Sequence, residues 1–184
     1  MNIKDILDKA YNFSEEIKDI KIFNSGNTLG YVTPWNNYGY EIAKKFTNKF
    51  SFISPVWLSL TYDGNDFQIL GSQDIDIKWI MDLQKKNSEI KIFPRLLFDN
   101  WTPSNFIKLV RSEYITSRCL ETISRFLLKY NFDGVVLEMW LQIGVYSKSD
   151  AYHFLTHFGQ EMKNKNLIYI LAIPPPIYRG YVYH

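Results

Sequence analysis

The stretch that decides the fold reads Phe132-Asp133-Gly134-Val135-Val136-Leu137-Glu138-Met139-Trp140. It is a short apolar run that begins at a turn-forming Asp-Gly pair, and such a run predicts a buried β-strand from Gly134 to Trp140. Side chains alternate along a strand, so Val136, Glu138 and Trp140 share one face while Leu137 lies on the other. We expect Leu137 to face covering helices and Glu138 to face the opposite side of the sheet.

The rest of the chain alternates between apolar runs and amphipathic segments. The apolar runs predict further strands at about 28–33, 52–60, 90–97 and 167–173. Helices are predicted over 39–49, after caps at Asp76 and Thr102, over 115–127 and after a cap at Ser149. The pair Asp63-Gly64 predicts a hairpin turn into a short strand over 67–70.

This order of strands and helices indicates an α/β fold with a parallel sheet covered by helices. A doubly wound sheet and a (β/α)8 barrel both meet that description. A barrel needs eight strand–helix units and about 250 residues, whereas the 184 residues of this chain contain five such strands. The sequence therefore predicts either a small open sheet or the front part of a barrel.

The composition excludes several classes of protein. Hydrophobic residues make up 46% and aromatic residues 17% of the chain, which is enough to fill the core of one folded domain. The formal net charge of +2 gives no strongly basic surface, so nucleic acid is not expected as a partner. No apolar run approaches the ~20 residues that span a bilayer, so no membrane insertion is expected. The first residues also lack the apolar run of a signal peptide.

No sequence motif indicates a cofactor. The chain has neither a GxGxxG motif nor a Walker loop, and with Cys119 as its single cysteine a Cys/His structural zinc site is excluded. His153 and His157 lie four residues apart on a predicted helix, a spacing that two metal ligands can use. No third ligand lies near them in the sequence, so we interpret the pair as polar residues at the edge of an amphipathic helix.

The opening Phe132-Asp133-Gly134 resembles the fourth barrel strand of the family 18 glycoside hydrolases, which include chitinases and chitinase-like lectins. Other blocks, in the same order along the chain, resemble one chitinase-like branch of that family. They are Gly30-Tyr31-Val32-Thr33-Pro34-Trp35-Asn36, Ile53-Ser54-Pro55-Val56-Trp57-Leu58, Pro94-Arg95-Leu96-Leu97-Phe98 and Ile173-Pro174-Pro175. The resemblance implies the N-terminal part of a (β/α)8 TIM barrel, with about five parallel strands present and the barrel incomplete. It divides the chain into an N-terminal extension over 1–27, with a short helix, and a partial barrel over 28–184.

The resemblance also bears on catalysis. The position of the family's catalytic glutamate is occupied by Trp140, whose indole N–H has no proton of useful pKa for a glycosidic oxygen. Glu138 replaces a family aspartate on the same face, but it lies two residues earlier, roughly 6–7 Å deeper along the strand. We therefore expect a protein that is not an enzyme. The alternative is a hydrolase that uses Glu138 or Asp99 as an unconventional acid.

Six residues are candidates for saccharide binding because they lie near strand ends or on the inward face. They are Tyr31, Trp35, Phe98, Trp101, Glu138 and Trp140. The carboxyl ends of barrel strands form the active face of such folds, and aromatic rings stack on the apolar faces of sugars. For each aromatic residue the competing interpretation is core filling, and for Glu138 it is a buried carboxylate bonded to neighbouring strands.

The resemblance implies oligosaccharides of the chitin or N-acetylglucosamine type as ligands. It also implies secretion or a lysosomal location, and a protein receptor of the stabilin type as a partner. A third interpretation follows, in which the barrel face is a receptor-interaction module and sugar is incidental. The sequons at Asn12 and Asn100 would matter only in the secretory pathway. Because neither a signal peptide nor the last barrel units are visible, we interpret the chain as truncated.

Overall fold

The computed structural model describes residues 2–5, 17–21, 25–140 and 148–174, and the backbone of 177–178 and 181–182. Its strands are β1 (Leu29–Val32), β2 (Phe52–Pro55), β3 (Leu58–Tyr62), β4 (Phe67–Leu70), β5 (Lys91–Ile92), β6 (Arg95–Phe98), β7 (Gly134–Glu138), β8 (Ile168–Leu171), β9 (Ile177–Tyr178) and β10 (Tyr181–Val182). The helices are α2 (Asn37–Lys45), α3 (Ile77–Lys86), α4 (Pro103–Arg111), α5 (Glu113–Lys129) and α7 (Lys148–Asn164), with short 3-10 turns at Thr47–Lys49 and Ser72–Asp74.

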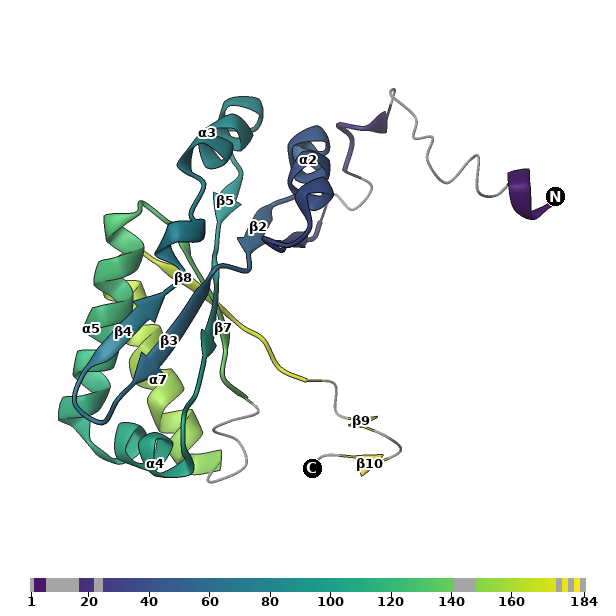
Figure 1. Ribbon diagram of the computed structural model, residues 1–184. Helices are drawn as coiled ribbons and strands as arrows, with labels where there is room; N and C mark the ends of the chain where they lie inside the picture. The colour runs from purple at the N-terminus through teal and green to yellow at the C-terminus, as the bar shows by residue number, and fades with distance from the viewer. Residues whose placement is uncertain are drawn as a thin grey trace.

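The sheet follows the predicted order. Strands β2 and β3 continue one another along the chain, as do β5 and β6, so the neighbours run β1, β2/β3, β5/β6, β7, β8. All these pairs are parallel. The predicted hairpin is confirmed, because β4 pairs antiparallel with β3. The chain thus forms an open α/β sheet with the strand order of part of a (β/α)8 barrel, and the barrel is not closed (Figure 1).

Helix caps confirm two of the predicted starts and correct others. The Asp76 side chain accepts a hydrogen bond from Trp79 N at 2.9 Å, and Thr102 accepts one from Asn105 N at 3.2 Å. The helix predicted over 39–49 instead begins at Asn37, because Asn36 caps it. The predicted cap at Ser149 is wrong: α7 begins at Lys148, and a residue inside a helix cannot be its non-helical cap.

All five helices contribute to one core on one face of the sheet. The fully buried members include Leu58, Leu60, Leu96 and Leu137 from strands and Leu83, Leu109, Ile123, Phe154 and Phe158 from helices. Helices α5 and α7 lie side by side over this face (Figure 1). Leu137 is buried in this core, whereas the neighbouring Glu138 is partly exposed on the other face. The predicted register is therefore confirmed for Leu137 and Glu138, whereas the predicted strand end at Trp140 is wrong, because β7 ends at Glu138.

A bulge lies between β2 and β3. Ile53 pairs with Ile92 and Leu58 with Leu96, so five steps along one strand oppose four along its partner. The extra residue lets two consecutive side chains, Trp57 and Leu58, enter the helix-side core. Without it, strict alternation would turn one of them to the opposite face.

The Phe132-Asp133-Gly134 motif joins three strands. The Oδ2 atom of Asp133 accepts a hydrogen bond from Ile92 N at 2.8 Å, and its carbonyl accepts one from Ile168 N at 3.1 Å. At Gly134 the backbones of β7 and β8 approach so closely that an added Cβ would lie 1.8 Å from Ile168 O. Phe132 is buried beside Trp57, with ring centroids 6.4 Å apart.

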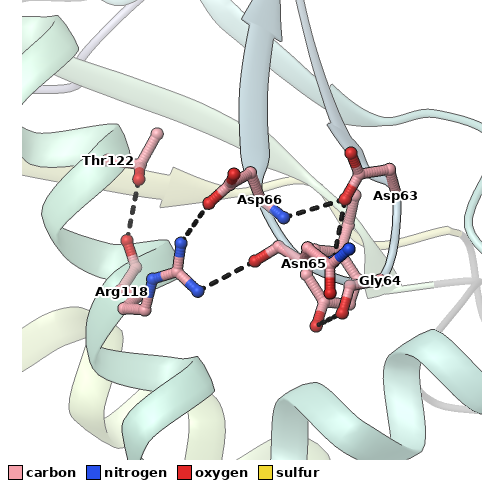
Figure 2. Close-up of polar contacts among 7 residues, drawn as sticks. Asp63, Gly64, Asn65, Asp66, Arg118 and Thr122 are labelled. Carbon is pink, nitrogen blue, oxygen red and sulfur yellow. Dashed lines mark hydrogen bonds and ion pairs between the residues drawn. The ribbon is translucent and has the colours of Figure 1, made fainter.

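The β3–β4 turn is attached to α5 (Figure 2). Backbone N–H groups of Asp66 and Asn65 donate to Asp63 Oδ1, both at 2.8 Å, and these bonds lower the pKa of the Asp63 carboxyl. Arg118 donates to Asn65 O at 2.8 Å and pairs with the Asp66 carboxylate. The turn is therefore fixed by one arginine from the helix that covers it.

Two expectations concern the chain outside the barrel. Most of the predicted N-terminal helix falls on residues 6–16, which lie outside the described residues. Residues 17–21 contact the start of the barrel, since Lys21 Nζ donates to Ser51 Oγ at 2.9 Å. Across the part of the chain that the structure describes, no helix combines the length and apolar character needed to cross a membrane.

Gly134→Ala should destabilise the fold by about 3 kcal/mol, because the new methyl group must push β8 away from β7. Thermal and urea unfolding of the variant would measure this. The matched control is Gly26→Ala, where an added Cβ meets no atom within 4 Å and the change should stay within about 0.5 kcal/mol. Equal unfolding midpoints for the two variants would contradict the packing described at Gly134.

Candidate functional site

The face of the sheet opposite the helices carries the polar side chains that could bind a ligand. Tyr31 on β1 pairs with Ser54 on β2, while Arg95 pairs with Val136 and Leu97 with Glu138. Paired residues of parallel strands project to the same side. Tyr31, Ser54, Arg95, Val136 and Glu138 therefore share what we call the inner face. Ser54 Oγ is buried there and has no hydrogen-bond partner within the described residues.

An ion pair forms the centre of the inner face. The Nε atom of Arg95 lies 2.7 Å from Oε2 of Glu138, linking β6 to β7. The Arg95 side chain is 22% exposed and the Glu138 side chain 45% exposed. Partial burial reduces solvent screening, so this pair is held more firmly than one on an open surface.

The Tyr31 phenol lies close enough to this pair for both charges to shift its pKa. Burial raises the pKa of its phenol, the Glu138 carboxylate raises that pKa further, and the Arg95 guanidinium opposes the rise. The residue is still 53% exposed. Three strands thus bring a phenol, a guanidinium and a carboxylate together on one accessible surface.

Two predicted aromatic residues are accessible at strand ends. Trp35 is 78% exposed, directly before the Asn36 cap that starts α2. Trp140 is half-buried just beyond the last residue of β7. Both remain candidates for stacking on a sugar, together with Tyr31.

Phe98 and Trp101 do not belong to the inner face, which corrects the sequence prediction. Phe98 is only 2% exposed, and its ring packs against Phe106 and Phe154 of the covering helices. The reason is register: Leu97 pairs with Glu138, so the next residue points to the opposite face. Trp101 donates its indole N–H to Leu60 O at 2.8 Å, and its ring packs against that same helix-side cluster.

Asp99, considered above as an alternative acid, follows β6 and is half-buried. Its backbone N–H donates to Leu60 O at 3.0 Å, and its carboxylate accepts a hydrogen bond from Asn100 Nδ2 at 3.3 Å. These bonds hold the turn at the end of the strand.

Arg95 is the site residue that sequence reasoning missed. It lies inside the block Pro94-Arg95-Leu96-Leu97-Phe98, which we interpreted only as part of the family resemblance. A signal was present, because a cation within an otherwise apolar strand requires a partner or access to solvent. Its partner Glu138 could be identified only once the two strands were aligned.

A cluster of three or more metal ligands and a reactive cysteine are both lacking among the described residues. Within them, no three His, Cys, Asp or Glu side chains cluster closely enough to hold a metal ion. His153 and His157 lie together on α7, with ring centroids 4.5 Å apart. Cys119 is fully buried, and burial raises the pKa of its thiol far above the usual range, which removes its reactivity.

Comparison with solved structures places the fold. No family model matches the chain. A chitinase from Chromobacterium violaceum superposes with a TM-score of 0.66 at 16% identity, over 86% of this chain and 50% of its own. A mutant class V chitinase from Nicotiana tobaccum, in complex with NAG4, gives a TM-score of 0.61 at 17% identity, over 85% and 47%. A GH18 chitinase from Cycas revoluta, in complex with (GlcNAc)3, gives 0.60 at 12%, over 86% and 50%.

These similarities show that the chain has the fold of part of a GH18 chitinase barrel. It spans about half the length of the solved chains that it matches. At this identity the comparison supports the fold, and the function depends on the residues of this chain.

The phenol of Tyr31 should report on the ion pair. Glu138→Gln should lower its pKa, because a carboxylate that disfavours the phenolate is lost, and Arg95→Gln should raise it. Carbon-13 NMR of labelled tyrosine, assigned with Tyr31→Phe, would follow the titration. Tyr40 is the internal control, since burial and Asp74 and Asp76 raise its pKa without Glu138. An unchanged Tyr31 pKa in both variants would show that the ion pair does not influence the phenol.

Proposed function

We propose that this protein is a non-catalytic chitinase-like protein that binds oligosaccharides of the N-acetylglucosamine type at the carboxyl ends of its strands. The observation that carries the proposal is Trp35, which is 78% exposed three residues beyond the end of β1, the strand that contributes Tyr31 to the inner face. An exposed indole next to hydrogen-bonding groups is suited to stack on a sugar ring. Two solved proteins with this fold hold chito-oligosaccharides, which supports the same class of ligand here.

We further propose membership of the GH18 superfamily, in the branch of chitinase domain-containing protein 1, also called stabilin-1-interacting chitinase-like protein. The support is the colinear set of sequence blocks from Gly30 to Pro175. Secretion or a lysosomal location, and a receptor of the stabilin type, belong to this proposal.

Two residues at and just beyond the end of β7 support the absence of catalysis. Trp140, at the position of the family's acid, offers no transferable proton. Glu138 contacts the Arg95 guanidinium at 2.7 Å, so its carboxylate acts as the partner of a cation. It is also the last residue of β7, two residues before Trp140. A general acid must carry a transferable proton and must reach the glycosidic oxygen. Neither Trp140 nor Glu138 meets both requirements.

Trp35→Ala should weaken binding of chitotetraose about fivefold, corresponding to about 1 kcal/mol for one aromatic contact. Its melting temperature should stay close to that of the parent protein, because the ring is exposed. Titration calorimetry and thermal unfolding would measure both quantities. Tyr38→Ala is the matched control: Tyr38 is 70% exposed but lines a groove between α2 and α3. Unchanged affinity in Trp35→Ala would overturn the stacking role.

The protein should release no chromophore from an aryl chitobioside above the buffer rate, because a positioned acid contributes ~10²–10⁴-fold. Trp140→Glu should not restore activity, since Val136 and Glu138 replace the family aspartates around that position. Colorimetric assays of both proteins would measure turnover. Activity that disappears in Glu138→Gln would instead establish a hydrolase with an unconventional acid.

A further inference from the structure

A surface cavity lies between α4, α5 and α7, on the helix-covered side of the sheet (Figure 1). It has a volume of about 330 Å³. Its polar lining comes from all three helices and includes Arg111 on α4, Glu113 and Ser117 on α5, and His153 and His157 on α7. None of these residues belongs to the inner face. The cavity is therefore separate from the proposed saccharide site.

Two imidazoles are in contact on the α7 side of this cavity. His153 and His157 are four residues apart within α7, so they project from the same side of the helix. Their ring centroids are 4.5 Å apart, and their ring planes make an angle of 68°. Both residues are exposed, and neither ring forms a hydrogen bond with another described residue. Their nitrogens are therefore accessible to a ligand in the cavity.

The separation of the two rings matches a shared metal ion. An ion about 2.1 Å from one nitrogen of each ring, with about 90–110° between the two bonds, places the ring centroids about 4.5–5.2 Å apart. The observed 4.5 Å lies within that range. A single helix also holds the second imidazole close to an ion that the first has bound, which raises its effective concentration.

The charges around the histidines favour a cation. Glu113 lines the same cavity, while Arg111 lies 3.8 Å from Asp150. One guanidinium and two carboxylates leave a net charge of −1, which attracts a divalent cation. Imidazole nitrogen suits Zn²⁺, Ni²⁺ and Cu²⁺, whereas Mg²⁺ and Ca²⁺ prefer oxygen ligands.

We propose that His153 and His157 chelate a divalent transition-metal ion, with Glu113 contributing negative charge from the neighbouring helix. No third His, Cys, Asp or Glu clusters with the pair among the described residues, so water completes the coordination. The site lies on the helix side of the sheet and is independent of the saccharide site. This inference goes beyond the proposed function and does not rest on it.

Calorimetric titration of the full chain with ZnCl₂ near neutral pH tests the proposal. One Zn²⁺ ion should bind per chain, and MgCl₂ at the same concentration should not compete. His153→Gln and His157→Gln should each weaken Zn²⁺ binding at least tenfold, because a single imidazole cannot chelate. Zn²⁺ should raise the melting temperature of the parent protein and leave that of either variant unchanged.

Two variants serve as controls. His184→Gln removes the third histidine of the chain and should leave Zn²⁺ binding unchanged. His157→Gln combined with Gln160→His keeps the number of histidines but separates the pair by seven residues, about 10.5 Å along the helix. This double variant should bind Zn²⁺ as weakly as His157→Gln alone. Without metal, all variants should melt close to the parent protein, because the two histidines are exposed.

An unchanged Zn²⁺ affinity in His153→Gln or in His157→Gln would overturn the metal site. Binding of inorganic phosphate that is lost in Arg111→Gln, without Zn²⁺ binding to the parent protein, would overturn it in favour of an anion site. Chitotetraose should bind the parent protein and His153→Gln equally, with or without Zn²⁺. Zn²⁺ binding without any oligosaccharide binding would overturn the proposed function and support the metal site.

Discussion

The close approach of β7 and β8 is the constraint on which the rest of the sheet depends. Gly134 has no Cβ, and only that allows the carbonyl of Ile168 to come so near. One residue earlier, Asp133 takes the N–H of Ile92 with its side chain and the N–H of Ile168 with its carbonyl. Asp133 and Gly134 therefore fix the alignment of β5, β7 and β8 relative to one another. These contacts fix the register of β7, and therefore the face of the sheet to which each of its side chains points.

That register separates an apolar, buried face of the sheet from a polar, partly exposed one. On the helix side, Leu137 and Phe98 enter a continuous apolar core. On the inner face, Glu138 lies one residue after Leu137 on β7 and Arg95 lies three residues before Phe98 on β6, and both side chains are partly exposed. The bulge at Trp57 and Leu58 departs from this alternation and adds a second large side chain to the core.

The inner face carries an ion pair and a phenol on the same side of the sheet. The Glu138 carboxylate and the Arg95 guanidinium form an ion pair that has no net charge. Tyr31 and Trp35, on and just beyond β1, supply exposed aromatic surface. The proposed function uses this combination to bind a neutral, ring-shaped, hydroxyl-rich ligand.

The sequence by itself determined the strand order, the hairpin at Asp63-Gly64, the caps at Asp76 and Thr102, and the two faces of β7. Each depends on periodicity or on a local hydrogen bond, which neighbouring residues specify. The sequence could not tell that Trp35 is exposed and Phe98 is buried. The exposure of each side chain depends on where its strand ends and on the direction the chain takes there. Only the tertiary structure paired Arg95 with Glu138, since these residues are 43 positions apart and meet through the alignment of β6 with β7.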